Sequence, residues 1–435
     1  MAILIGIIFL FWLIFFVKKP TGSALIYALF LFPPTIIVFS WPIEFYTKRW
    51  VALAILLYVI SKRGFSLFKT FPLKSLVLLM FLESCILILP DGRFDVLHRI
   101  LYPIMDALDV YLPLFLGFSF AFLSGTRTEK LLKPITICCI IVELYGLFEL
   151  FTSLNPIREL IGQIYDMDLS VMGDNDRDII TSIYRYSFDY GFNSSLFLLL
   201  FAYYYLTQKE RFKIIHGFAT VLSLLGVFLC GSRSVLLAVV VAFSVYLIFI
   251  KSKKIRLIAI LGGAATLLLL YVFVPSVSNM INLTIQTIIG GVDIAGSSST
   301  DMRSEQFAGS LYYMLRNPIW GNGFKYIFID LDWANRTQEA GMAGYESLVF
   351  VLMIERGIIG LATYLIFFVG IIVYFLKYCF KRMAEAILGL SIIIMFLLFA
   401  VFTGALDSWL NTMVFCGVLI AKIVESKNSN IAIIR

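Results

Sequence analysis

Three arginines are the side chains best suited to bind an anionic group. Arg233 lies between two long apolar runs with almost no loop, Arg185 precedes another such run, and Arg303 lies in a polar segment. An arginine at a membrane boundary is costly without a partner, and its guanidinium can bind a phosphate through two parallel hydrogen bonds. Together the three would form a cationic pocket for a pyrophosphate at a membrane surface.

Each arginine also has a structural alternative. Arg233 would then extend toward water or join an ion pair, as intramembrane arginines do when they have no ligand. Arg185 and Arg303 would be solvated residues of loops.

A carboxylate and an aromatic ring lie at the end of the longest polar segment, 275–346. Glu346 stands where this segment meets an apolar run, and there it would act as a general base. The alternative is an acid in the first turn of a helix, favoured by the helix dipole. Tyr345 would stack on a sugar, although an interfacial aromatic belt explains it equally well.

Four acids interrupt apolar runs: Glu83, Glu143, Glu149 and Asp407. They would be proton-relay groups of a transporter or, alternatively, groups hydrogen-bonded inside a helix bundle. The two histidines, His98 and His216, have no partner at metal-ligand spacing, and no glycine-rich nucleotide loop occurs. We therefore expect no metal and no cofactor.

The elements that must position these residues are membrane helices. The chain has 435 residues, of which 60% are hydrophobic and 14% charged, with a mean hydropathy of +0.94. Soluble domains carry roughly 25% charged residues, disordered chains are far less apolar, and membrane barrels show short alternating segments. The sequence predicts an all-α polytopic membrane protein with about 12 or 13 transmembrane helices. One span is predicted over Thr21–Ile43.

Basic residues set the expected orientation. They gather in five short connections, which contain Lys62, Arg127, Lys209, Lys251 and Lys377. The positive-inside rule places these connections in the cytoplasm, so the net charge of +7 is a topology signal and not a nucleic-acid-binding face. Three longer loops then lie outside: 91–109, 152–189 and 275–346.

The longest outer loop is expected to carry structure, because long ordered loops usually carry function. Ser299-Thr300-Asp301 predicts the start of a helix over Met302–Leu315, and Asn317–Gly323 predicts a tight turn. The chain divides into four parts: N-terminal helices 1–184, central helices with the outer arginines 185–274, the large loop 275–346, and C-terminal helices with a cytoplasmic tail 347–435.

The order of these features resembles the bacterial O-antigen polymerase and O-antigen ligase superfamily. The residues that carry the resemblance are Arg185 with Gly191-Phe192-Asn193, Gly231-Ser232-Arg233-Ser234, Arg303 with Asn317-Pro318-Ile319-Trp320-Gly321-Asn322-Gly323, and Tyr345-Glu346-Ser347-Leu348 leading to Glu355-Arg356-Gly357-Ile358-Ile359-Gly360-Leu361. The resemblance covers about 185–376, and the first 180 residues match only as a series of spans.

The resemblance implies a glycosyltransferase of the bacterial inner membrane, of the GT-C-like kind, that works on the extracytoplasmic face. Its donor and acceptor would be undecaprenyl-pyrophosphate-linked oligosaccharides, without a nucleotide sugar or a metal. Arg185, Arg233, Arg303 and Tyr345 would bind substrate. Arg303 would also stabilise the leaving pyrophosphate, and Glu346 would accept the proton of the acceptor hydroxyl. A polysaccharide chain-length regulator is an expected partner, and nucleic acid is not.

Two further functions remain open. In ligases of this superfamily, which transfer the chain to lipid A-core, a His-Asn pair occupies the place of Glu346-Ser347, so the sequence favours a polymerase. A lipid-linked oligosaccharide flippase or other transporter would explain the number of spans and the intramembrane acids. It would also predict matching halves, which the sequence does not display.

Overall fold

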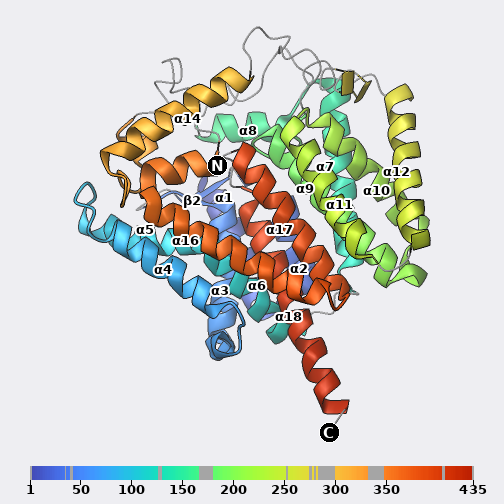
Figure 1. Cartoon of the computed structure of the whole chain (residues 1–435), viewed down its shortest axis with the longest axis horizontal. Coiled ribbons are helices and arrows are strands. Elements are labelled where there is room, and N and C mark those ends of the chain that lie inside the picture. Colours follow the sequence, from blue (N-terminus) through green and yellow to red (C-terminus); the bar gives the residue numbers. More distant parts are fainter. Residues whose placement is uncertain are drawn as a thin grey trace.

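The computed structural model describes residues 2–34, 36–39, 43–125, 130–165, 180–250, 253–273, 277–278, 281–282, 299–331, 347–403 and 407–433. Its main elements, in chain order, are α1 Ala2–Lys18, α2 Gly22–Leu31, β1 Ile37–Phe39, β2 Phe45–Tyr46, α3 Thr47–Ser61, η1 Gly64–Lys69, α4 Lys74–Ile88, α5 Val96–Asp106, η2 Ala107–Tyr111, α6 Leu112–Ser124, α7 Leu132–Thr152, α8 Pro156–Tyr165, α9 Ser187–Thr207, η5 Lys209–Arg211, α10 Ile214–Leu229, α11 Arg233–Phe249, α12 Lys253–Phe273, α14 Ser299–Arg316, α15 Tyr326–Ile329, α16 Leu348–Cys379, α17 Ala384–Phe402 and α18 Trp409–Ile433 (Figure 1).

The chain is an all-α polytopic membrane protein. Over the described ranges, five helical segments are long and apolar enough to cross a membrane: Val96–Ser124, Leu132–Thr152, Leu348–Cys379, Ala384–Phe402 and Trp409–Lys427. Four further apolar helices are shorter: Gly6–Lys18, Gly22–Leu31, Ile214–Leu229 and Arg233–Phe249. The expected total of about 12 or 13 spans stays a prediction.

Two expected boundaries were wrong. The run Thr21–Ile43 is not one helix: α2 ends at Leu31 and a short antiparallel hairpin, β1 and β2, follows. Pro33 and Pro34 explain the stop, because proline lacks the N–H donor and restricts the residue before it. The expected loop 91–109 is largely helical, and its helix continues through the π-helix η2 into α6.

The centre of the bundle depends on a close contact between α6 and α18. A Cβ atom at Gly117 would lie 2.3 Å from the carbonyl oxygen of Val414, and one at Gly417 would lie 2.2 Å from that of Leu114. Each glycine therefore lets the other helix approach at backbone distance, as small residues do in membrane bundles. The buried Trp409 adds a hydrogen bond from its Nε1 to the carbonyl oxygen of Val110 (2.7 Å).

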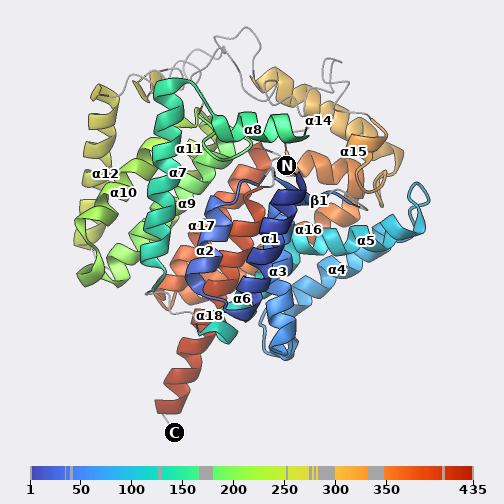
Figure 2. The same ribbon diagram turned by 180° about the vertical axis from the view of Figure 1, so that it is seen from behind.

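The bundle has two chemically different ends. Helices α8 and α14 lie across one end, which we call the loop end, and α18 ends at the opposite one (Figures 1 and 2). The start of α12, with Lys253 and Arg256, and the turn from α16 to α17, with Arg382, lie at that opposite end. We call it the basic end.

The long helix α16 is interrupted at Gly357, and the turn that follows α14 is hydrogen-bonded to α16 at this interruption. Gly357 has φ 58° and ψ −153°, a backbone conformation that essentially only glycine adopts. Four backbone hydrogen bonds join the break to the turn after α14: Asn322 N to Ile354 O (2.9 Å), Gly323 N to Glu355 O (3.0 Å), Ile358 N to Pro318 O (2.9 Å) and Ile359 N to Ile319 O (3.2 Å). The turn thus satisfies backbone groups that the broken helix leaves open.

Both predictions for the large loop are confirmed in the described residues. The helix expected over Met302–Leu315 is α14, which extends one turn at its N-terminal side and ends at Arg316. The expected turn is closed by a hydrogen bond from Gly321 N to Asn317 O (2.9 Å), with positive φ at Gly321 and Gly323. Because this turn inserts into α16, it fixes the direction in which α14 leaves the bundle.

Candidate functional site

The three predicted arginines lie at the loop end, around the end of α17. Arg233 is the first residue of α11, and Arg185 precedes α9 by two residues. Both α9 and α11 pack along α17. Arg303, on α14, donates from Nη2 to the carbonyl oxygen of Phe402 (2.5 Å), the last residue of α17. The central part of the chain therefore brings two arginines to this end and the large loop brings one, while the C-terminal part supplies the helix α17 that they surround.

Aromatic packing fixes the start of α9 against α17. The rings of Phe192 and Phe399 have centroids 4.8 Å apart, and Phe188 lies 6.1 Å from the same Phe399 ring. The first two turns of α9 are almost entirely buried. This packing holds the chain just before α9, which carries Arg185, beside the end of α17.

A buried carboxylate positions the segment before Arg185. Glu149, near the end of α7, accepts hydrogen bonds from the backbone N–H of Thr181 (3.1 Å) and of Ser182 (2.6 Å). Asn155 donates from Nδ2 to the carbonyl oxygen of Ser182 (2.8 Å). Hydrogen bonds that involve a charged group are among the stronger ones in proteins, so these contacts fix the approach to α9.

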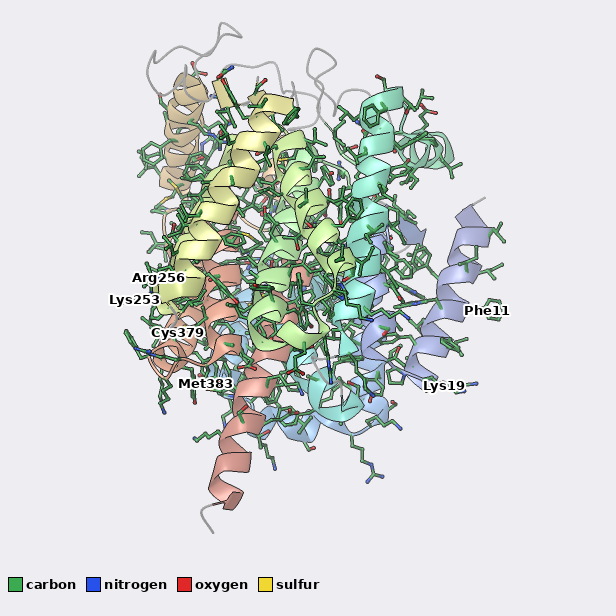
Figure 3. All side chains as sticks on the ribbon, turned by 90° about the vertical axis from the view of Figure 1, so that its right-hand side faces the viewer. Phe11, Lys19, Lys253, Arg256, Cys379 and Met383 are labelled. Carbon is green, nitrogen blue, oxygen red and sulfur yellow. The ribbon has the colours of Figure 1, made fainter. Side chains whose placement is uncertain are left out.

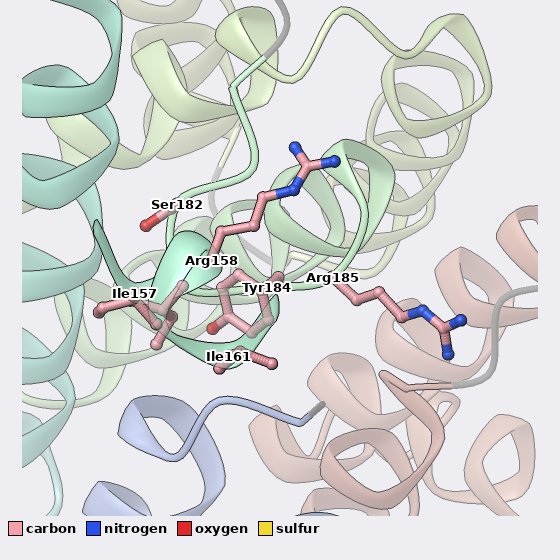
Figure 4. Close-up of a pocket in the computed structure, with 7 residues that line it drawn as sticks. Ile157, Arg158, Ile161, Ser182, Tyr184 and Arg185 are labelled. Carbon is pink, nitrogen blue, oxygen red and sulfur yellow. The ribbon is translucent and has the colours of Figure 1, made fainter. Parts of the chain in front are cut away.

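A small pocket lies beside this segment and includes Arg185. It has about 270 Å³ of empty space, is lined mainly by apolar side chains, and is bordered by Arg158 and Tyr184. Figure 4 shows that the guanidinium groups of Arg158 and Arg185 point in different directions, with Arg185 extending toward the C-terminal helices. Arg185 is thus directed toward the part of the bundle that contains α17.

Sequence reasoning missed a set of ion pairs at the start of α3. Lys48 pairs with Asp407 (3.1 Å), and Arg49 binds Asp109 through Nε (3.0 Å) and Nη2 (2.7 Å). Asp109 belongs to the π-helix η2, a distortion that is frequent at functional sites. The available signal was the positive-inside rule, because Lys48 and Arg49 are basic residues on a connection opposite the five basic clusters.

These ion pairs are electrically linked to Arg185. Arg185 interacts electrostatically with Asp189, whose carboxylate accepts a hydrogen bond from Ser408 (2.8 Å) and also faces the charges of Asp407 and Lys48. The positive charge of Arg185 also interacts electrostatically with Tyr46. The loop end therefore holds Arg185 beside a network of paired charges from α3, α9 and the start of α18.

Two groups of this region outside the spans have shifted pKa values. Burial, together with the hydrogen bond to Glu44, raises the pKa of Tyr46 well above its ordinary value. Burial, and then the positive charge of Arg49, lower the pKa of Lys325, whose ammonium lies 4.7 Å from the centre of the Tyr102 ring. Cationic and acidic groups thus influence one another across this face.

The acids that interrupt apolar runs are engaged inside the bundle. Glu83 pairs with Arg356 (2.6 Å), which also binds Asp106 (2.6 Å), so one buried arginine joins α4, α5 and α16. Glu143 accepts a hydrogen bond from Tyr190 (2.6 Å). These contacts favour the interpretation that the acids are hydrogen-bonded groups of the bundle.

Two predicted site residues, Glu346 and Tyr345, lie outside the described residues. The description resumes at Ser347, the N-cap of α16, whose hydroxyl accepts a hydrogen bond from Val349 N (3.2 Å). The roles assigned to Glu346 and Tyr345 stay predictions.

No cluster of three or more histidine, cysteine or acidic side chains suited to a metal occurs in the part of the chain that the structure describes. His216 lies 2.9 Å from the Thr136 hydroxyl, and His98 lies 2.8 Å from Asp95. Each histidine is thus engaged in a local contact between protein side chains.

Comparison with known proteins supports the relationship drawn from the motifs. Residues 218–365, about a third of the chain, match the sequence family described as O-antigen ligase. The matched segment contains Arg233, Arg303 and the turn that inserts into α16, whereas Arg185 precedes it. No curated protein matches this chain. The match supports the O-antigen polymerase and ligase superfamily and does not separate its two activities.

Proposed function

We propose that this protein is a surface-polysaccharide polymerase of the bacterial inner membrane. It transfers the growing glycan from undecaprenyl pyrophosphate to the non-reducing end of an incoming undecaprenyl-pyrophosphate-linked repeat unit. The reaction takes place on the extracytoplasmic face, which corresponds to the loop end.

The observation that carries this proposal is the position of three arginines at one end of the bundle. Arg303 is bound to the last carbonyl of α17, and Arg185 and Arg233 start from helices that pack on α17. A lipid pyrophosphate reaches the protein with its phosphates at the membrane surface, where fixed guanidinium groups can neutralise them.

The proposed step is a direct displacement at the anomeric carbon. The hydroxyl oxygen of the acceptor forms a bond to that carbon, and the bond from the carbon to the phosphate oxygen breaks. Glu346 takes the proton of the hydroxyl, and undecaprenyl pyrophosphate leaves with the bonding electrons. Negative charge grows on the leaving pyrophosphate, so arginines fixed around it stabilise the transition state more than the ground state.

A ligase is the second candidate, and the family match supports it, since that family is described as O-antigen ligase. The donor and its arginines would be the same, and only the acceptor would differ. The residues Glu346-Ser347, where ligases of the superfamily carry His-Asn, support the polymerase instead.

The test is turnover by purified protein in liposomes. Lipid-linked repeat units are added with or without lipid A-core, and the products are separated on a gel. A polymerase forms a ladder from the repeat units alone, whereas a ligase forms product only when lipid A-core is present.

Variants assign the donor site in the same assay. Arg185→Gln, Arg233→Gln and Arg303→Gln should each slow turnover by about 100-fold or more, the loss typical when a group that stabilises transition-state charge is removed. Arg211→Gln, at the basic end, is the matched control and should keep the parental rate. Parental rates in all three arginine variants would contradict the assignment.

A further inference from the structure

A hollow lies far from the proposed active site, at the basic end. It has a cavity volume of about 340 Å³, which is at the lower end of the roughly 300–1,000 Å³ of typical ligand pockets. Its walls come from the end of α11, the start of α12 and the turn between α16 and α17. Figure 3 shows Lys253, Arg256 and Cys379 close together in the lower part of the bundle.

Three cationic side chains line the hollow: Lys253, Arg256 and Arg382. Over the described ranges, none of them forms an ion pair with an acid. The positive charge is therefore not neutralised by the described carboxylates, and it comes from two places, the start of α12 and the turn after α16.

Arg256 is held in place but is not satisfied. Its Nη2 donates to the carbonyl oxygens of Ile250 (2.9 Å) and Ile248 (3.2 Å), which fixes the guanidinium against the end of α11. Its Nε is buried and has no hydrogen-bond acceptor among the described atoms. A buried donor without an acceptor is destabilising. This N–H group would therefore be stabilised by an oxygen atom of a bound ligand.

Arg382 is placed by an unusual backbone. It has φ 60°, in the left-handed region that residues with a side chain rarely adopt, and its N–H bonds the carbonyl oxygen of Cys379 (2.8 Å). Such conformations persist where surrounding structure imposes them. Here the tight turn brings Arg382 to the hollow that Arg256 also lines.

The remaining lining is apolar. Phe249 and Phe380 form an edge-to-face pair with centroids 5.9 Å apart, and Phe380 is 73% exposed. On α12, Leu257 and Leu261 are 57% and 60% exposed. An exposed apolar surface on a helix predicted to cross the membrane faces acyl chains, so an apolar surface suited to lipid lies beside the cationic hollow.

We propose that this hollow binds the phosphate headgroup of an anionic phospholipid from the leaflet at the basic end. Phosphate oxygens would accept from Arg256 and Arg382, while the acyl chains would pack along Phe380 and α12. Basic pockets between helices on the cytoplasmic side are a recognised way to bind such headgroups. A free phosphate would satisfy the cations but would leave the apolar wall unused. This site is independent of the proposed glycosyl transfer.

The test measures lipid binding and not activity. Purified full-length protein in nanodiscs of phosphatidylcholine is titrated with phosphatidylglycerol or cardiolipin, and retained lipid is counted by native mass spectrometry. The double variant Arg256→Gln/Arg382→Gln should bind the anionic lipid about 10- to 30-fold more weakly, as expected for the loss of two interfacial charges. Lys62→Gln/Lys133→Gln, which changes basic residues elsewhere, is the matched control and should bind like the parent.

A second pair protects the test from misfolding. Lys253 and Arg382 are exposed side chains, so Lys253→Gln/Arg382→Gln leaves the backbone contacts of Arg256 intact. This pair should also weaken binding, and it should abolish the rise in thermal stability that anionic lipid gives the parent. Equal retention of phosphatidylcholine, parental binding by both double variants, or displacement of the lipid by millimolar inorganic phosphate would each overturn the proposal.

Discussion

Replacing Gly357 by alanine should detach the turn after α14 from helix α16. Gly357 interrupts α16 at φ 58° and ψ −153°, and a Cβ atom there would meet three backbone atoms: Gly321 N at 2.6 Å, Pro318 O at 2.7 Å and Ile319 O at 2.8 Å. These atoms belong to the turn itself and not to the ends of flexible side chains. The variant must therefore move the turn away from α16 or change the backbone of Gly357.

The expected destabilisation follows from two contributions. A residue with a side chain in this backbone region costs about 1–3 kcal/mol. Moving the turn breaks the bonds from Ile358 N to Pro318 O and from Ile359 N to Ile319 O, which contribute about 0.5–1.5 kcal/mol each. Together these give about 2–6 kcal/mol.

The assay is thermal unfolding of the purified protein in detergent, followed by turnover in liposomes. Gly357→Ala should lower the unfolding midpoint by at least about 2 °C and should also reduce turnover, because α14 and its Arg303 are no longer fixed. Gly263→Ala is the matched control: a Cβ atom there meets nothing within 4 Å, so its midpoint should stay the same or rise. A parental midpoint and parental turnover in Gly357→Ala would refute this account of the turn.

Three further predictions separate structural groups from functional ones. Arg356→Met leaves Glu83 and Asp106 buried without their cation. It should destabilise the fold by about 3–5 kcal/mol, which thermal unfolding would show as a lower midpoint. An unchanged midpoint would contradict the stabilising role of this buried group of three charges. Glu149→Gln should lower turnover and increase hydrogen exchange at Ser182, because an amide donor replaces one of the two acceptor oxygens that fix this segment. Unchanged exchange at Ser182 would contradict that role. Burial alone would raise the pKa of Asp91, but the hydrogen bonds and charge of Arg93 outweigh it and hold the pKa below its ordinary value. The contribution of the Asp91–Arg93 contact to folding stability is therefore fully present above about pH 4, and it is lost as the pH falls through the lowered pKa of Asp91. Proteolysis near Arg93 should accordingly accelerate only in acid.

The sequence indicated the class of fold and the ends of several helices for clear physical reasons. Long apolar runs must form helices in lipid, and the asparagine- and glycine-rich turn after α14 was recognisable from its residue types. The hairpin after α2 was missed because hydropathy alone does not register the effect of Pro33 and Pro34. The helical start of the segment Val96–Ser124 was missed because its acids are paired with basic residues distant in sequence.

The candidate site was only partly predictable. The three arginines could be selected from their place beside apolar runs, but their common position around α17 depends on helix packing that no local pattern encodes. The pairs of Lys48 with Asp407 and of Arg49 with Asp109 join residues 359 and 60 positions apart, which a single sequence does not reveal. Likewise, the motif residues Pro318 and Gly357 looked like separate signals, although they form one hydrogen-bonded unit.

The measurement that tests the central claim most directly is turnover by purified protein in liposomes with lipid-linked repeat units alone. The account predicts a ladder of longer glycans without nucleotide sugar or added metal, and loss of that ladder in Arg185→Gln, Arg233→Gln and Arg303→Gln. Movement of the lipid-linked sugar across the bilayer without any ladder would contradict glycosyl transfer and would assign the protein to transport.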